Sequence, residues 1–173
     1  KNSIIESIKL NKNKYSETTG IEELKNAIIE KLKTENNISV KPKNIIVTAG
    51  VSGGIYLSYL VLFNPDDEVI IFDPYFVMYK QLAQLNSIKC RFINTYNDFK
   101  IDLDLILKCI TKKTRAIILN NPANPTGMIM SEAEIKGIIN IASKYGLYII
   151  SDEIYEKYNY SDKVVSPGSI YDR

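Results

Sequence analysis

Four clusters of polar and aromatic residues could do chemistry, and each follows a short apolar run that predicts a β-strand. The clusters lie at residues 50–52, 73–76, 120–127 and 152–155. Where parallel strands alternate with helices, ligands bind at the carboxyl ends of the strands. We therefore expect the four clusters to meet at one edge of a sheet.

The longest cluster lies between the apolar run 116–119 and the amphipathic segment 131–145. Pro122 and Pro125 fix φ and restrict the residue before each of them. The asparagines of this stretch can bond to the backbone or to a ligand. An isolated Asn-Pro pair more often marks a turn, so these residues alone leave a structural loop and a binding loop both open.

The first two clusters offer a phosphate site and an aromatic ring. Gly50, Val51 and Ser52 begin a predicted helix, whose backbone N–H groups and positive end would bind a phosphate. Glycines of this kind also make plain turns, and the stretch matches neither the dinucleotide-binding nor the P-loop fingerprint. In the second cluster, residues 73–76, one of the two aromatic rings could stack on a planar ligand, or both could pack in the core.

The last cluster contains an acid and a phenol. Asp152 follows the apolar run 147–150, where an unpaired carboxylate is costly to bury. A cationic heterocyclic nitrogen would be a suitable partner. Tyr155 lies three residues later and would face the same way on a helical turn. The alternative is that Asp152 caps the next turn and that Tyr155 simply packs.

The elements that must position these clusters alternate along the chain. Apolar alternation and turn residues predict strands at 45–48, 68–72, 89–94, 115–119 and 147–151. Helical spacing predicts helices at 21–36, from the glycine-rich turn to 63, at 75–85, 102–110 and 131–145, and Thr19 with Glu22 fits a capping box. This α/β alternation predicts a mainly parallel sheet with helices on both faces, a three-layer α/β/α fold.

Composition excludes several classes of function. The chain has 173 residues, 45% of them apolar, and a net charge of +2 with interspersed signs, which gives no basic face for nucleic acid. No apolar run approaches the roughly 18–20 residues that a membrane span needs. With no histidine, it lacks His-based acid–base catalysis, Ser-His-Asp triads and His-ligated metals. Cys90 and Cys109 do not make a zinc site. We expect a cytoplasmic protein without a bound metal.

Together the four clusters suit pyridoxal 5'-phosphate, whose protonated pyridine acts as an electron sink. The chain resembles the large, cofactor-binding domain of fold-type I, class I/II pyridoxal-phosphate-dependent aminotransferases of the aspartate/aromatic type. The matching motifs are Tyr15-x-x-x-x-Gly20, Val47-Thr48-Ala49-Gly50, Pro65-Asp66-Asp67-Glu68-Val69, Asp73-Pro74-Tyr75-Phe76, Asn121-Pro122-Ala123-Asn124-Pro125-Thr126-Gly127 and Ser151-Asp152-Glu153-Ile154-Tyr155.

The resemblance implies a role for each matching residue at the ring. Asp152 would bond the pyridine nitrogen and keep it protonated. Asn124 and Tyr155 would bond the phenolic oxygen, and Phe76 would stack on the pyridine face. Asp152 and Tyr155 are thus the implied catalytic residues, and all four are implied cofactor ligands.

The resemblance also implies a phosphate site and a dimer. Gly50, Val51 and Ser52 would hold the phosphate through backbone N–H groups, with help from the Ser52 hydroxyl. Tyr15 matches a tyrosine that reaches the phosphate bound by the partner subunit, which implies a homodimer.

The implied activity is amino-group transfer from an amino acid to a 2-oxo acid. The family's Schiff-base lysine, in a Ser-x-Ser-Lys context, has no match before Arg173. We therefore expect residues 1–173 to be part of the large domain, without the C-terminal small domain, and to be inactive alone. A β-lyase of the same fold, a non-catalytic sensor module of a regulator and a doubly wound domain for another phosphate compound are the alternatives.

Overall fold

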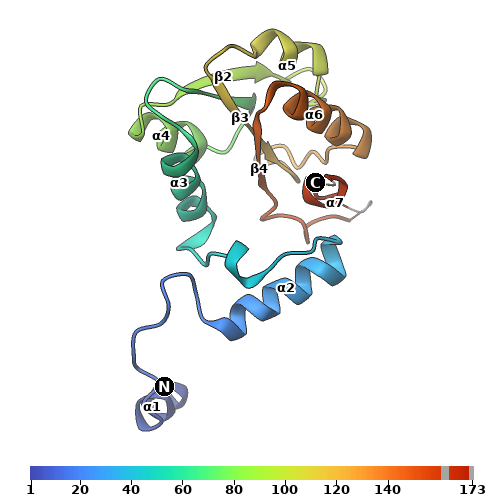
Figure 1. The fold of residues 1–173 in the computed structure, drawn as a ribbon. Helices are drawn as coiled ribbons and strands as arrows, with labels where there is room; N and C mark the ends of the chain where they lie inside the picture. Colours follow the sequence, from blue (N-terminus) through green and yellow to red (C-terminus); the bar gives the residue numbers. More distant parts are fainter. Residues whose placement is uncertain (161–163, 172–173) are drawn as a thin grey trace. The chain divides into compact units, whose positions relative to one another are not determined.

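A computed structural model describes residues 1–160 and 164–171. The chain forms two compact units, Lys1–Thr48 and Ala49–Arg173, and each is considered by itself (Figure 1). The first contains the helices α1 (Asn2–Lys9) and α2 (Glu22–Asn36) and the 3₁₀-helix η1 (Pro42–Asn44). The second contains a sheet with its flanking helices. The expectation of one partial large domain over residues 1–173 stays a prediction.

The start of α2 differs from the sequence prediction. Ile21 occupies the N-cap position and no side chain caps the helix, so the capping box of Thr19 and Glu22 is wrong. The Thr19 hydroxyl instead accepts a hydrogen bond from Lys25 Nζ at 3.2 Å, and the same ammonium pairs with Glu17 at 3.0 Å. The Thr19 hydroxyl, which the sequence pattern assigned to capping the helix, thus bonds to the buried Lys25 instead.

The strand predicted at 45–48 is also absent from the described residues. Its backbone bonds to turns instead, since Val47 N donates to Thr19 O at 3.0 Å and Ile45 N donates to Pro42 O at 3.2 Å. A β-rich run becomes a strand only where a neighbour continues the hydrogen-bond ladder. None of the four described strands pairs with this segment.

The second unit is built on a parallel sheet. Its strands β1 (Glu68–Asp73), β2 (Lys89–Asn94), β3 (Thr114–Asn120) and β4 (Tyr148–Asp152) lie in the order β2-β1-β3-β4. All three pairings are parallel. The carboxyl ends therefore share one edge, where Asn120 is the register partner of Asp152.

Helices cover both faces of this sheet, as predicted. The helices α3 (Gly50–Leu62) and α4 (Met78–Leu85) pack on one face, and α5 (Leu103–Cys109), α6 (Glu132–Tyr145) and α7 (Pro167–Ile170) pack on the other (Figure 1). Successive residues of β1 enter opposite cores, with Val69 and Ile71 on the α3 side and Ile70 on the α6 side. The strand is continuously apolar because both faces are buried.

The loop after β1 is longer than predicted. Helix α4 begins at Met78 rather than at Tyr75, so the second cluster lies in the loop itself. Tyr75 stacks on Phe92 of β2 with ring centroids 4.9 Å apart. This contact keeps Tyr75 beside β2, whereas the ring of Phe76 lies against Tyr79.

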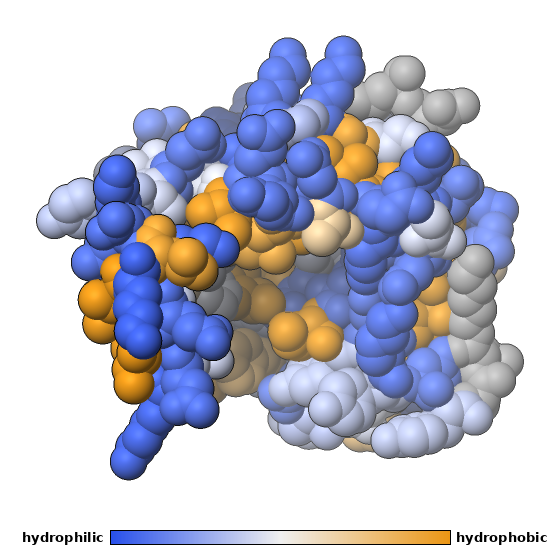
Figure 2. Space-filling view, turned by 90° about the horizontal axis from the view of Figure 1, so that it is seen from below, coloured by the Kyte–Doolittle hydropathy of each residue, from blue (hydrophilic) through white to orange (hydrophobic). Residues whose placement is uncertain are grey.

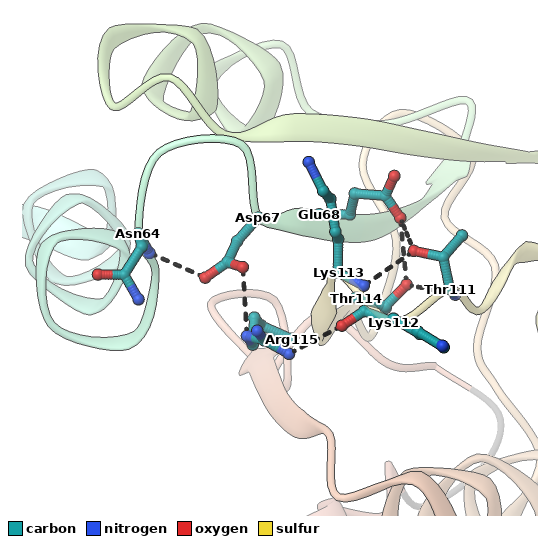
Figure 3. A network of polar contacts seen from close by, with 8 residues as sticks. All are labelled: Asn64, Asp67, Glu68, Thr111, Lys112, Lys113, Thr114 and Arg115. Atoms are coloured by element: carbon teal, nitrogen blue, oxygen red, sulfur yellow. Dashed lines mark hydrogen bonds and ion pairs between the residues drawn. The ribbon is translucent and has the colours of Figure 1, made fainter.

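At the amino ends of the strands, buried acids join β1 to β3 and to the loop before β3 (Figure 3). Glu68 Oε2 accepts hydrogen bonds from the hydroxyls of Thr111 at 2.6 Å and Thr114 at 3.3 Å. Asp67 pairs with Arg115 Nε at 3.3 Å. These contacts tie the amino ends of β1 and β3 together, so they fix the relative positions of the strands that lead to two of the four clusters, 73–76 and 120–127.

Apolar residues are not confined to the cores. Figure 2 shows apolar patches among hydrophilic side chains on one face of the molecule. In α3, Ile55 and Tyr59 are buried while Leu57, Leu60 and Val61 are exposed. The apolar surface of α3 therefore extends beyond the side that packs on the sheet. No helix in the described part of the chain has the length and apolarity needed to cross a bilayer.

We expect the substitution Gly20→Ala to destabilise the first unit locally. Gly20 has φ +103°, and an added Cβ would collide with the Val47 side chain. A strained backbone of this kind costs about 1–3 kcal/mol. Native-state hydrogen exchange of the Val47 amide measures the effect, which is faster exchange in the variant.

Gly146→Ala is the matched control, because Gly146 also has positive φ but has open space around its Cβ position. It should leave exchange of the Val47 amide unchanged. Equal Val47 exchange in the parent and in Gly20→Ala would contradict the steric account.

Candidate functional site

A pocket of about 220 Å³ lies at the carboxyl edge of the sheet, within the second unit. Its lining comes from the start of α3, the β1–α4 loop and α4, the β3–α6 loop and the end of β4. The lining residues are Ala49, Gly50, Val51, Ser52, Phe76, Tyr79, Asn120, Asn124, Asp152, Ile154 and Tyr155.

The pocket collects the sequence-predicted residues of all four clusters. Gly50, Val51, Ser52, Phe76, Asn124, Asp152 and Tyr155 all line it. Tyr15 belongs to the first unit and is exposed there, so its contact with a partner's phosphate stays a prediction. Two further lining residues had no individual role in the sequence analysis, namely Tyr79 and Asn120.

Asp152 is the buried acid of the site. It is the last residue of β4 and only 5% exposed. Its Oδ2 accepts a hydrogen bond from the Tyr79 hydroxyl at 2.7 Å, and its Oδ1 accepts one from Ile154 N at 3.2 Å. A turn rather than a helix follows. The carboxylate therefore caps that turn and lines the pocket at once, which combines the two sequence interpretations.

Asn120 joins the loop after β3 to the end of β4. Its Oδ1 accepts from Asn124 N at 2.7 Å, and its Nδ2 donates to the Asp152 carbonyl oxygen at 3.2 Å. One side chain thus sets the backbone positions of two pocket residues. Its position at the end of β3 was the available signal, but the missing information was the register that places it beside Asp152.

The amide of Asn124 and the phenol of Tyr155 meet across the pocket wall. Asn124 Nδ2 donates to the Tyr155 hydroxyl oxygen at 3.3 Å, although the residues are 31 positions apart. Asn121, in the same loop, does not line the pocket. Its side chain is buried, and its Oδ1 accepts from Met130 N at 2.9 Å. Asn121 therefore shapes the loop, and Asn124 presents its amide to the pocket.

Phe76 and Tyr79 form the aromatic side of the pocket. Their rings meet edge to face, with centroids 5.7 Å apart and planes at 82°. Phe76 is half-buried, whereas Tyr79 is 1% exposed. Phe76 lies in the loop before α4 and Tyr79 lies in the first turn of that helix, so the two rings meet where the loop joins the helix.

The beginning of α3 forms the polar floor. Gly50 has φ +73° and open space at its Cβ position. Val51 and Ser52 follow in the first helical turn, where backbone N–H groups lack intrahelical acceptors. The positive end of the helix dipole favours an anion here. The pocket can thus hold a molecule that is anionic at one end and basic at the other, where Asp152 lies.

Burial also determines how Tyr79 behaves. Desolvation, followed by the charge of Asp152 and the hydrogen bond to it, raises the pKa of the Tyr79 phenol far above its ordinary value. Burial likewise raises the pKa of Tyr59, whose hydroxyl donates to the Tyr79 carbonyl oxygen at 3.2 Å. Tyr79 is therefore a neutral hydrogen-bond donor. Among residues 1–160 and 164–171, no cluster of acids or thiols could hold a metal ion.

Comparison with known proteins places these residues in a wider context. The family model described as aminotransferase class I and II matches residues 3–171. A probable aspartate aminotransferase of Methanocaldococcus jannaschii is 43% identical over 162 residues, which are 94% of this chain and 43% of the relative. The aspartate aminotransferase of Bacillus subtilis is 39% identical over 163 residues, with 92% of this chain and 42% of the relative covered.

Solved structures of aminotransferases also match the fold of this chain over almost its whole length. An alanine aminotransferase structure from Pyrococcus furiosus matches with a TM-score of 0.92 and 34% identity, covering 99% of this chain and 44% of that structure. The chain thus spans less than half the length of the proteins that it matches.

We expect Tyr79→Phe to destabilise the chain by about 1–3 kcal/mol at pH 8, because it leaves Oδ2 of the buried Asp152 without its donor. Since the pKa of this phenol is raised in the folded state from 10.0, the contribution of Tyr79 is complete below pH 10. It is lost as the pH rises above 10, where the unfolded chain releases the proton more readily.

Urea unfolding of the parent and the variant between pH 8 and pH 11 measures this difference. The deficit of Tyr79→Phe should shrink above pH 10. A deficit that stays constant with pH would show that the phenolic proton does not contribute.

Proposed function

Because this chain belongs to the class I and II aminotransferases, we propose that its pocket binds pyridoxal 5'-phosphate and serves amino-group transfer from an amino acid to a 2-oxo acid. The observation that carries the proposal is one cavity bounded by a helix amino terminus and by a buried carboxylate. These are the groups that an anionic phosphate and a basic ring nitrogen require.

The donor set of the pocket fits the cofactor. Backbone N–H groups of Val51 and Ser52 suit the phosphate, and the bare Gly50 leaves room for its close approach. The Asn124 amide and the Tyr155 phenol, already within 3.3 Å of each other, suit an oxygen on the ring. The phosphate, the ring nitrogen and the ring oxygen of the cofactor thus each have a chemically matched partner on the described chain.

When bound, pyridoxal phosphate supplies an electron sink for chemistry at an amino acid's α-carbon. Asp152 holds a proton on the ring nitrogen, since its carboxylate charge favours the cationic form. Asn124 and Tyr155 orient the ring through its oxygen. Phe76 covers one ring face and excludes water from it.

The substrates and assembly of the complete protein form part of the same proposal. The relatives are named for aspartate or alanine, and we propose an amino acid and a 2-oxo acid as the substrate pair. We also propose a homodimer in which Tyr15 of one subunit reaches the phosphate held by the other. The exposure of Tyr15 leaves its ring available for this contact.

Replacing Asp152 tests the assignment of the ring-nitrogen partner. We expect Asp152→Ala to weaken pyridoxal phosphate binding about tenfold to a hundredfold, the equivalent of a charge-assisted hydrogen bond. Titration of the purified chain, followed by absorbance of the cofactor, gives the dissociation constant.

Glu132→Ala is the control for the loss of a carboxylate, because Glu132 lies on the exposed side of α6 and pairs with Lys136. It should bind like the parent. If Asp152→Ala folds and also binds like the parent, the ring-nitrogen assignment is wrong.

Replacing Phe76 separates stacking from core packing. We expect Phe76→Leu to weaken cofactor binding by about 0.5–1.5 kcal/mol beyond the change in buried area. Phe92→Leu is the matched control, because Phe92 stacks on Tyr75 outside the pocket lining. Equal affinities of Phe76→Leu and Phe92→Leu would argue that Phe76 only fills the core.

A further inference from the structure

We propose that Tyr79 is a positioning residue for Asp152, and that its hydroxyl orients the carboxylate toward the ring nitrogen. This inference rests on the proposed function, because the ring nitrogen belongs to the proposed cofactor. Tyr79 lies on α4 and Asp152 ends β4, so the two residues meet only in the folded unit.

The contact is short and shielded from water. The Tyr79 hydroxyl donates to Asp152 Oδ2 at 2.7 Å, within the range of strong O–H···O⁻ bonds. The exposed fractions are 1% for Tyr79 and 5% for Asp152. Few water molecules can therefore replace the phenol as a donor to this oxygen.

The backbone around Tyr79 is also held in place. The hydroxyl of Tyr59, itself fully buried, donates to the Tyr79 carbonyl oxygen. Tyr59 lies on α3, the helix whose first turn forms the proposed phosphate site. The phosphate end and the ring-nitrogen end of the pocket are thus connected through α3 and α4.

The carboxylate of Asp152 lines the pocket and can accept further hydrogen bonds. Each oxygen of Asp152 accepts one donor, Tyr79 on Oδ2 and Ile154 N on Oδ1. An ionised carboxylate has about four acceptor positions, so capacity for a pyridinium N–H is left. Two donors from different elements also fix the plane of the group, and this orientation is what a bond to a planar ring requires.

The phenol also supports the bond to the ring nitrogen. Without Tyr79, Oδ2 of Asp152 would lose its donor and the plane of the carboxylate would no longer be fixed from two sides. Its bond to a protonated ring nitrogen would then weaken. Burial raises the pKa of Tyr79 itself, so this donor keeps its proton.

The test uses the chain loaded with pyridoxal phosphate that carries ¹⁵N at the ring nitrogen. In the parent, the ¹⁵N chemical shift should be that of a protonated pyridine. In Tyr79→Phe it should move toward the unprotonated value, and the dissociation constant should rise about threefold to tenfold. A shift that stays at the parent value in a folded Tyr79→Phe overturns the inference, because Tyr79 then only packs.

Two further variants complete the test. Tyr75→Phe removes a hydroxyl from the preceding loop, where Tyr75 stacks on Phe92 outside the pocket lining, and it should leave the ¹⁵N shift unchanged. Tyr79→His keeps an N–H donor and should retain more of the protonated signal than Tyr79→Phe. If Tyr79→Phe does not fold, a folded Tyr79→His with the unprotonated value overturns the inference.

The result for the parent separates this inference from the proposed function. Absence of saturable pyridoxal phosphate binding by the parent overturns both. Binding by the parent that is lost in Asp152→Ala, combined with an unaltered ¹⁵N shift in Tyr79→Phe, supports the proposed function and overturns only the role of Tyr79.

Discussion

The buried carboxylate of Asp152 is the constraint on which the site depends. An ionised acid with 5% exposure is unfavourable unless donors surround it. Tyr79 from α4 and the backbone of the following turn supply two of them. The proposed ring nitrogen would be a third. Fold stability and ligand binding thus converge on the same group, because both require donors at the end of β4.

The parallel sheet makes this convergence possible. Its pairings bring the ends of β3 and β4 into register, and Asn120 then spans the two through Asn124 and Asp152. At the amino ends of the strands, buried acids hold β1 and β3 together through an ion pair and hydrogen bonds. At the carboxyl ends, polar groups line the pocket.

The sequence predicted features that depend on local patterns. Apolar runs located the four described strands to within one or two residues, and the motif around Asp152 identified a polar strand end. Tyr79 was not predicted, and Asn120 was predicted only as one of several asparagines in its cluster, because their partners are 73 and 32 residues away. At such a distance no local spacing identifies the partner. Their roles depend on helix packing and strand register, which only the fold provides.

The wrong predictions have the same origin. Thr19 and Glu22 matched a capping pattern, but the buried Lys25 ammonium bonds to the Thr19 hydroxyl instead. Residues 45–48 have strand propensity, but Val47 N bonds to Thr19 O in an earlier turn, and none of the described strands pairs with the segment. In both segments a contact outside the local window decided the structure.

A crystal structure of the chain grown with pyridoxal phosphate tests most directly whether Asp152 pairs with the ring nitrogen. We expect phosphate density at the first turn of α3 and a ring nitrogen within hydrogen-bonding distance of Asp152, with Phe76 over the ring. Cofactor bound elsewhere, or bound in this pocket with its ring nitrogen turned away from Asp152, would contradict this pairing.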